Sequence, residues 1–167
     1  MKKIALILTS LFFTGFCNIY SQQQTISDDD NYYSINIPSG WVHAYSKNKI
    51  ISVLMCSDTV NTNERLSINA TKNYYNLAKT YKTNKDAFKD FKNFKLIQEG
   101  DGTIGGQPSK WFVYTFDASD GQKMQGKQIT SIKSGKTYII QYVVTQKRHD
   151  AIRDTFDNMI ASLKFNK

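Results

Sequence analysis

Short stretches in the first half of the chain alternate apolar and polar residues. Tyr33-Ser-Ile-Asn-Ile37 alternates cleanly and is followed by Pro38-Ser-Gly40. Ile50–Cys56 is mostly apolar, and Leu66-Ser-Ile-Asn-Ala70 alternates again. A period of two residues is typical of a β-strand with one buried face. The pattern therefore predicts three strands before residue 71.

The segment after the third strand changes to a helical period. At about 100° per residue, four apolar side chains fall within an arc of roughly 80°: Leu77, Tyr81, Phe88 and Phe91. They predict an amphipathic helix over about Tyr75–Asn93. Its flank carries four lysines, which we call the lysine stripe: Lys82, Lys85, Lys89 and Lys92. We expect Asp86 and Asp90 on the opposite flank.

The second half returns to strands. The first begins over Phe94–Glu99, and the next two long apolar runs, Trp111–Phe116 and Tyr138–Val144, are apolar on both faces. Met124–Lys133 lies between those two runs. Strands of the doubly apolar kind need cover on both sides of their sheet.

Glycine-rich pairs separate these strands and predict turns. Asp120-Gly121 and Ser134-Gly135 are typical of hairpins, and we expect further turns at Gly100-Asp-Gly102 and at Gly105-Gly-Gln-Pro108. A second amphipathic helix is expected over about Arg148–Leu163. The predicted fold is α+β, with a mostly antiparallel sheet of about six to seven strands flanked by two helices in an α/β/α sandwich.

The N-terminus has the pattern of a secretory signal peptide. Lys2 and Lys3 precede an apolar run over Ile4–Phe16, and the small residue Ser21 precedes Gln22. The run is too short to span a membrane, which takes about 20 apolar residues. We therefore expect cleavage between Ser21 and Gln22, and a periplasmic or secreted protein without an integral membrane segment after cleavage.

Cys17 raises a lipid anchor as an alternative. The bulky Phe16 stands where a lipobox has a small residue, so an anchor at Cys17 is disfavoured. Residues 22–31 are polar and are expected to form a flexible lead-in, and residues 32–167 a single domain. Cys56 is the only other cysteine, which leaves no internal disulfide. We expect its thiol to be buried and inert.

The net charge of the chain indicates which classes of partner it could bind. The chain has 22 basic and 14 acidic residues, and it stays basic without Lys2 and Lys3. Because export separates the protein from nucleic acid, an envelope protein or assembly with an acidic surface is the more accessible partner. The candidate docking residues are the lysine stripe, with Trp41 and His43 near the first strand. The simpler alternative is that the stripe is only a solvated helix face.

Patterns that carry chemistry are weak. Gly100-x-Gly102-x-x-Gly105 spells a dinucleotide fingerprint, but Pro108 and a strand follow it where a helix is needed. The two histidines, His43 and His149, are far apart in the sequence, and no zinc-ligand spacing or Gly-x-Ser-x-Gly elbow is present. We expect His149 to be solvated. The sequence predicts no catalytic residue, no cofactor-binding residue and no metal ligand, and hence a non-enzymatic protein without a cofactor.

The set of motifs resembles the PsbP-like family, named for an extrinsic subunit of plant photosystem II. The resemblance rests on Tyr33-Ser-Ile-Asn-Ile-Pro-Ser-Gly-Trp41, Thr103-Ile-Gly-Gly-Gln-Pro-Ser-Lys-Trp111, Lys136-Thr-Tyr-Ile-Ile-Gln-Tyr142 and the ending Ile160-Ala-Ser-Leu-Lys-Phe165. It implies an antiparallel sheet flanked by helices. It also implies accessory roles, such as docking on a larger assembly or chaperoning a partner, and no shared catalytic residues.

Three functions follow in order of preference. The first is a non-enzymatic exported accessory protein that binds or chaperones a macromolecular partner in the cell envelope. The second is a carrier of a small apolar ligand between sheet and helix, which an unexplained tubular cavity would favour. The third is an envelope hydrolase, which a histidine and a carboxylate converging on a serine would favour.

Overall fold

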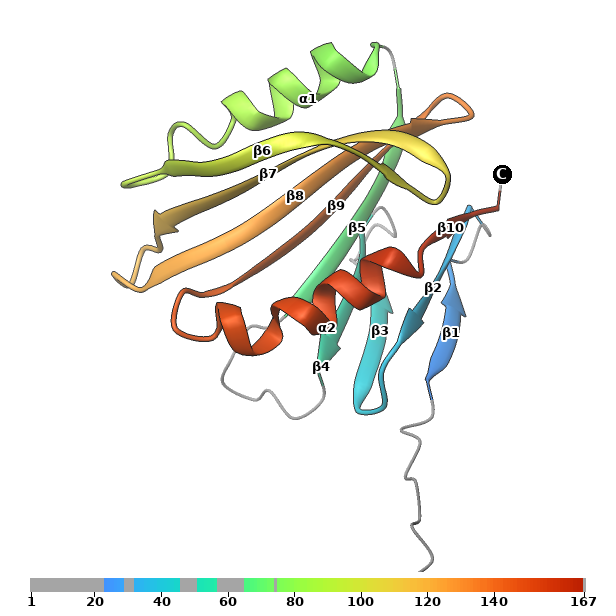
Figure 1. The fold of residues 1–167 in the computed structure, drawn as a ribbon, viewed down its shortest axis with the longest axis horizontal. Coiled ribbons are helices and arrows are strands. Elements are labelled where there is room, and N and C mark those ends of the chain that lie inside the picture. The colour runs from blue at the N-terminus through green and yellow to red at the C-terminus, as the bar shows by residue number, and fades with distance from the viewer. Residues whose placement is uncertain (1–22, 29–31, 46–50, 57–64, 74, 167) are drawn as a thin grey trace, which may run out of the picture.

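A computed structural model describes residues 23–28, 32–45, 51–56, 65–73 and 75–166. Two antiparallel sheets and two helices make up this part of the chain (Figure 1). The larger sheet has seven strands in the order β3-β4-β5-β9-β8-β7-β6, and the smaller has three in the order β1-β2-β10. The helices are α1 (Leu77–Asp86) and α2 (His149–Ala161).

Four long strands form the continuous half of the large sheet. They are β6 (Lys95–Ile104), β7 (Gln107–Asp117), β8 (Lys123–Lys133) and β9 (Lys136–Thr145). Consecutive strands pair with one another, so this half is a meander of hairpins. Gly105 and Gly106, with φ of 53° and 75°, form the two-residue turn between β6 and β7. Positive φ at both positions suits glycine and matches the twist of a hairpin.

The N-terminal strands complete the large sheet on its other side. They are β3 (Trp41–Tyr45), β4 (Ile51–Cys56) and β5 (Arg65–Lys72), and β5 pairs with β9 across a long gap in sequence. The small sheet joins β1 (Gln24–Ser27) and β10 (Lys164–Phe165) to the two sides of β2 (Tyr33–Ile37). Both ends of the described chain therefore meet on β2.

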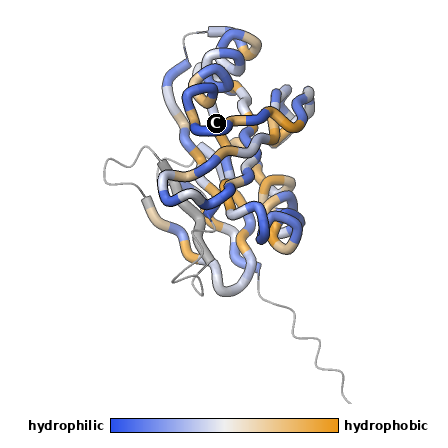
Figure 2. Tube along the Cα trace, turned by 90° about the vertical axis from the view of Figure 1, so that its left-hand side faces the viewer, coloured by the Kyte–Doolittle hydropathy of each residue, from blue (hydrophilic) through white to orange (hydrophobic). Residues whose placement is uncertain are grey.

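The two helices cover opposite faces of the large sheet. On β9, Val143 packs with the cluster under α1, whereas Tyr142 and Val144 belong to the larger cluster under α2. Successive side chains of a strand point to opposite faces, so two clusters alternating along one strand require a helix on each side. In Figure 2 the strands and helices change colour along their length, as expected of elements with one buried and one solvated face.

The fold class is the one the sequence predicts, and several boundaries differ. Strands β2, β4 and β5 lie where expected, as do the hairpin turns at Gly121 and Gly135. The expected flexible lead-in is wrong for Gln24–Ser27, because these residues pair with β2 as strand β1. The strands β3 and β10 were not predicted.

The first helix is shorter than its apolar period suggests. It ends at Asp86, and tight turns follow, in which the backbone N–H of Phe88, Phe91 and Phe94 each bonds the carbonyl three residues earlier. These turns carry the phenylalanines onto the same sheet face as the helix. At the helix start, the Asn76 side chain accepts a hydrogen bond from the Lys79 N–H at 2.9 Å, a standard N-cap.

Candidate binding groove

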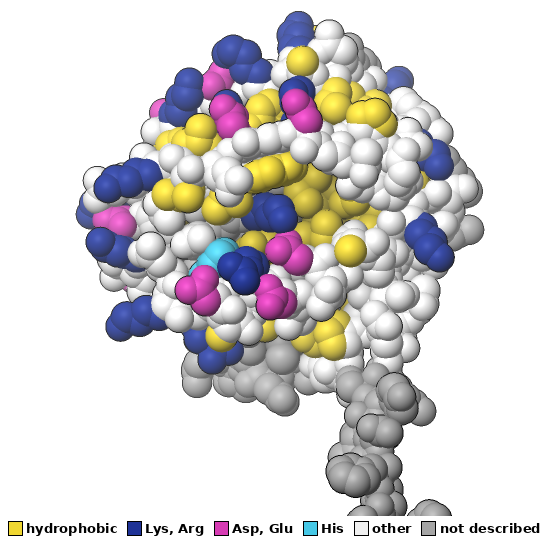
Figure 3. Space-filling model, viewed as in Figure 1, with side chains coloured by type: hydrophobic (Ala, Val, Ile, Leu, Met, Phe, Trp, Pro, Cys, Tyr) yellow, Lys and Arg dark blue, Asp and Glu magenta, His cyan; other side chains and the backbone are white. Residues whose placement is uncertain are grey.

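An open groove runs between α2 and strands β6–β8, and we call it the α2 groove. It has a volume of about 650 Å³. Residues from both layers line it, among them Gly102, Trp111, Lys127, Ile129, Asp157 and Ile160. Figure 3 shows this hollow in the middle of the face, floored by hydrophobic atoms, with charged side chains along its lower edge. The site is thus a solvent-open depression with an apolar floor.

Glycines on the edge strand allow the floor to form. Gly100 lies opposite Trp111 in the β6–β7 register. A Cβ at Gly100 would lie 2.9 Å from the Trp111 ring, and one at Gly102 would lie 3.6 Å from it. The indole therefore lies against backbone where other residues would place side chains. Sequence reasoning assigned Gly100-Asp101-Gly102 to a turn, and that was wrong, because all three lie within β6.

The Trp111 indole is hydrogen-bonded at one edge and exposed to solvent at the other. Its Nε1–H donates to the Asp101 carbonyl at 3.3 Å, and its side chain remains only half-buried. The expectation that this strand is covered on both faces holds for the α1 face, where Phe112 and Tyr114 are fully buried, and fails on the opposite face at Trp111. A held, partly exposed indole is a rigid apolar contact surface with a polar edge.

An ion pair bridges the groove wall from sheet to helix. Lys127 Nζ of β8 lies 2.9 Å from Asp157 Oδ1 of α2 and 5.8 Å from the centre of the Trp111 ring. The two side chains keep 22% and 41% of their surface exposed. A ligand on the indole would therefore find a cation and a carboxylate within the same hollow, able to donate to and accept from its polar groups.

The ionisable side chains of the described residues bear on the chemistry that the groove could support. They include no group of three or more His, Cys, Asp or Glu side chains placed to hold a metal ion. His149 is buried, not solvated as expected, and packs 6.2 Å from the Tyr142 ring with Nδ1 3.1 Å from Asp150 Oδ1. Burial raises the pKa of the Tyr142 phenol far above neutrality, so that phenol stays protonated.

The lysine stripe is largely engaged with the chain's own carboxylates. Lys82 and Lys89 both pair with Asp86, at 2.6 and 2.7 Å, so Asp86 does not lie on an opposite flank. Hydrogen bonds from these two lysines lower the pKa of Asp86 to about 2. Lys85 pairs with Glu99 of β6. Lys89 and Lys92 lie in the turns beyond the helix end.

The Lys85–Glu99 pair also holds the helix to the sheet. Tyr81 donates its hydroxyl to Glu99 at 2.6 Å. The Lys85 hydrogen bond, followed by that of Tyr81, lowers the pKa of Glu99. Two donors from α1 thus converge on one carboxylate of the edge strand, which gives this part of the stripe a structural role.

Trp41 and His43, the other candidate docking residues, lie on β3. Trp41 is 8% exposed and meets the Phe156 ring edge-on at 5.6 Å, so it belongs to the core. His43 is partly buried. The predicted cleavage residues Ser21 and Gln22, with Cys17, lie outside the described residues. Cys56 ends β4, and its side chain also lies outside what the structure describes.

The groove residues were missed, although one signal was present. A two-residue turn at Gly105-Gly106 pairs Ile104 with Gln107, and counting outward places Gly100 opposite Trp111. A glycine paired with a tryptophan on an edge strand indicates an indole lying across the strand. The Lys127–Asp157 pair had no such signal, because it depends on where α2 crosses the sheet.

The fold and these motifs agree with a known family. The sequence profile of the PsbP family matches residues 21–165. The chain belongs to the PsbP family. A search of the curated proteins finds no match to this PsbP-family chain. Within the described ranges, no helix is both long and apolar enough to cross a membrane.

Solved structures share the fold at low sequence identity. The solution structure of cyanobacterial PsbP from Synechocystis is 19% identical, with a TM-score of 0.62, over 95% of this chain and 98% of that chain. LpqN of Mycobacterium tuberculosis, described as involved in cell envelope biogenesis, is 13% identical, with a TM-score of 0.65, over 87% and 91%. A Bacteroides thetaiotaomicron protein is 15% identical, with a TM-score of 0.59, over 87% of this chain and 49% of that one. At these identities the likeness shows the fold alone.

Proposed function

We propose that this PsbP-family protein is an exported, non-catalytic accessory module that binds a macromolecular partner of the cell envelope through the α2 groove. The observation that carries the proposal is the partly exposed Trp111 indole, held on the glycines of β6 at the floor of an open groove. Partly buried aromatic side chains with fixed geometry dominate the energetics of protein interfaces. The signal-peptide pattern and the envelope role stated for LpqN support the location.

The groove suits a protruding segment of a protein. Its floor is apolar, whereas its wall offers the Lys127 ammonium and the Asp157 carboxylate. The apolar side chains of a peptide can contact the floor, and its backbone N–H and C=O groups can hydrogen-bond to the charged groups of the wall. The groove is open along the surface (Figure 3), which allows a chain to enter without a lid moving.

The alternative is a carrier of a small apolar ligand. A volume of about 650 Å³ falls within the range of small-molecule sites, and the indole would stack on a flat ligand. Such sites enclose most of their ligand, whereas this groove is open to solvent. The openness favours the macromolecular partner.

The test is affinity capture from the native envelope, with a variant that fills the groove. Ala161 is exposed at the end of α2 and lines the groove, so Ala161→Arg should obstruct it and leave the core unchanged. Ala151→Arg, at an exposed position of the same helix outside the groove, is the matched control. We expect wild type and the control to retain the same partners by mass spectrometry, and Ala161→Arg to lose them.

Two results would contradict the proposal. Equal capture by all three proteins would remove the α2 groove from partner binding. A small apolar molecule co-purifying with wild type and the control but not with Ala161→Arg, without any protein partner, would establish the carrier instead.

A further inference from the structure

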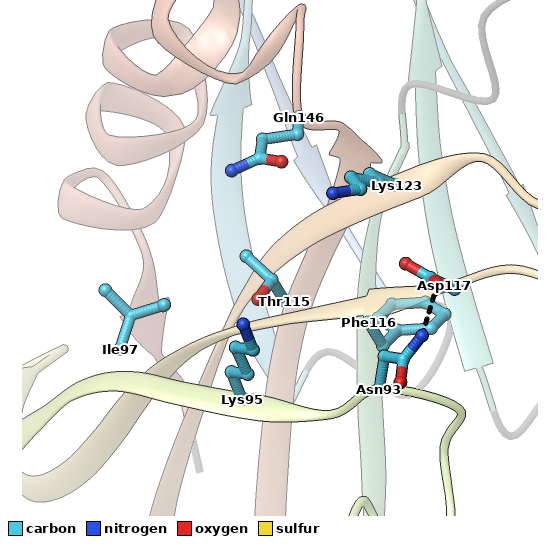
Figure 4. Close-up of a pocket in the computed structure, with 8 residues that line it drawn as sticks. All are labelled: Asn93, Lys95, Ile97, Thr115, Phe116, Asp117, Lys123 and Gln146. Carbon is cyan, nitrogen blue, oxygen red and sulfur yellow. Dashed lines mark hydrogen bonds between the residues drawn. The ribbon is translucent and has the colours of Figure 1, made fainter.

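A second pocket lies where four strand ends meet, and it shares no lining residue with the α2 groove. It has a volume of about 460 Å³. Lys95 at the start of β6 pairs with Thr115 of β7, and the Gln146 N–H donates to the Lys123 carbonyl at 2.8 Å. Figure 4 shows Lys95 rising toward Thr115, and Lys123 extending into the same space below Gln146. We call this the lysine pocket.

The two lysines of this pocket differ from those that form ion pairs. Five lysines of the described chain form ion pairs with carboxylates: Lys82, Lys85, Lys89, Lys110 and Lys127. Neither Lys95 nor Lys123 has an ion-pair or hydrogen-bond partner for its ammonium group among the described residues. Two ammonium groups facing one hollow repel each other, and a bound anion would relieve that repulsion.

Apart from one carboxylate, the other polar groups of the pocket are suited to an anion. Asp117 is its single carboxylate, and the Asn93 amide already donates to Asp117 Oδ2 at 2.7 Å. The Thr115 hydroxyl and the Gln146 amide add neutral donors. Lys147 lines the adjoining hollow together with Lys123 and Gln146, which extends the positive charge around the entrance. Two lysines and no free acidic cluster argue against a metal ion.

We propose that the lysine pocket binds a phosphate oxyanion, with Lys95 and Lys123 supplying charged hydrogen bonds and Thr115 and Gln146 neutral ones. Four donors around one hollow suit a tetrahedral phosphate, whose oxygens point in several directions, better than a planar carboxylate with two oxygens. The phosphate can belong to a free phosphorylated compound or to a lipid headgroup. Ile97, which is 57% exposed and lines the pocket, would lie next to the ligand.

The experiment uses residues 22–167, the form expected after signal cleavage, with two probes. The first is inorganic phosphate, titrated into labelled protein at constant ionic strength while backbone amide shifts are followed by NMR. The second is sedimentation with vesicles of phosphatidylglycerol, compared with vesicles of phosphatidylcholine. The test variant is Lys95→Gln with Lys123→Gln. The control is Lys79→Gln with Lys136→Gln, which removes the same charge at positions that do not line the pocket.

We expect saturable shifts at Thr115, Lys123 and Gln146 in wild type and in the control. Loss of two charged contacts should weaken phosphate binding by at least about tenfold in the test variant. Phosphate binding without vesicle binding would assign the pocket to a soluble phosphorylated compound. Binding of phosphatidylglycerol vesicles that free phosphate competes away would assign it to lipid headgroups. Both results support the pocket.

Two outcomes would overturn the proposal. One is the absence of a saturable response to either probe in wild type. The other is equal weakening in the test and control variants, which would reduce the effect to net charge. Thermal melting of each variant at high salt keeps loss of folding separate from loss of binding. Neither outcome bears on the α2 groove, which is tested with different residues.

Discussion

A graded series of glycine-to-alanine changes tests how closely the large sheet is packed. Gly126 of β8 lies between Tyr114 and Val143 in the strand register. A Cβ there would lie 2.7 Å from the Tyr142 carbonyl oxygen and 2.8 Å from the Tyr114 hydroxyl. The carbonyl is backbone in the neighbouring strand, so it cannot turn aside as a side chain would. We therefore expect Gly126→Ala to be the most damaging of the series.

The size of the expected loss of stability at Gly126→Ala follows from the atoms that must move to make room for the new methyl group. Overpacking a closed site costs about 1–3 kcal/mol. Displacing Tyr114 also strains its 2.6 Å hydrogen bond from Gln141, worth about 1 kcal/mol. The lower chain entropy of alanine returns about 0.5–1 kcal/mol. The expected net loss of unfolding free energy is about 1–3 kcal/mol, or roughly 3–10 °C in melting temperature for a chain of this size.

Two further glycines calibrate the result. At Gly100 the close atoms, 2.9 Å away, belong to the Trp111 indole, which can tilt into the open groove, so we expect a loss below about 1 kcal/mol. At Gly102 the nearest atoms lie at 3.5 Å or more, and alanine should be neutral within about 0.5 kcal/mol. Urea unfolding of all three variants measures the differences. Gly126→Ala as stable as wild type, or Gly102→Ala as damaging as Gly126→Ala, would refute the packing argument.

Four shorter predictions concern charge, the thiol and processing. Asp86 should titrate near pH 2 when its carboxyl is followed by NMR. Because the folded pKa lies below the unfolded value, the ionised carboxylate stabilises the fold above about pH 4, and this contribution is lost as the pH falls toward 2. A titration midpoint near pH 4 would contradict the hydrogen bonds from Lys82 and Lys89. Lys85→Glu should lower the urea concentration at the unfolding midpoint, because it places a like charge beside Glu99. An unchanged midpoint would show that the pair is not formed in solution. A thiol reagent should label Cys56 slowly in native protein and rapidly in denaturant, and fast native labelling would place the thiol at the surface. Intact-mass analysis of envelope material should find a chain beginning at Gln22, and a lipid-bearing chain beginning at Cys17 would overturn that assignment.

The fold could be predicted from sequence wherever one face of an element carries the hydrophobic signal. Tyr33, Ile35 and Ile37 all point into the core, so β2 is evident from its alternation. In β1, only Ile26 is buried, and four mostly polar residues cannot be told from a tail without knowing that β2 has an open side. β10 is two residues long, too short for any period.

The end of α1 illustrates a different difficulty. Phe88, Phe91 and Phe94 are spaced three apart, which fits one face of a helix and equally fits the tight turns that hold them. The spacing of apolar residues shows which way their side chains point. It does not show whether the backbone hydrogen bonds are those of an α-helix or of successive turns. The surroundings of the candidate docking residues also depend on tertiary neighbours: Phe156 covers Trp41, and three lysines of the stripe pair with Asp86 and Glu99. Charge content alone could not show which lysines are already paired.

The pairing of both chain ends with β2 has a consequence for when the protein can fold. The centre of the large sheet needs β5 beside β9, and the small sheet needs Phe165 beside Tyr33. Contacts between such distant segments form slowly, and the pairing of β10 with β2 cannot form before Phe165 has been synthesised. A chain that stops before residue 164 therefore lacks β10 and leaves one side of β2 unpaired. For the export that we propose, this slow closure of the small sheet would favour an unfolded chain at the translocase.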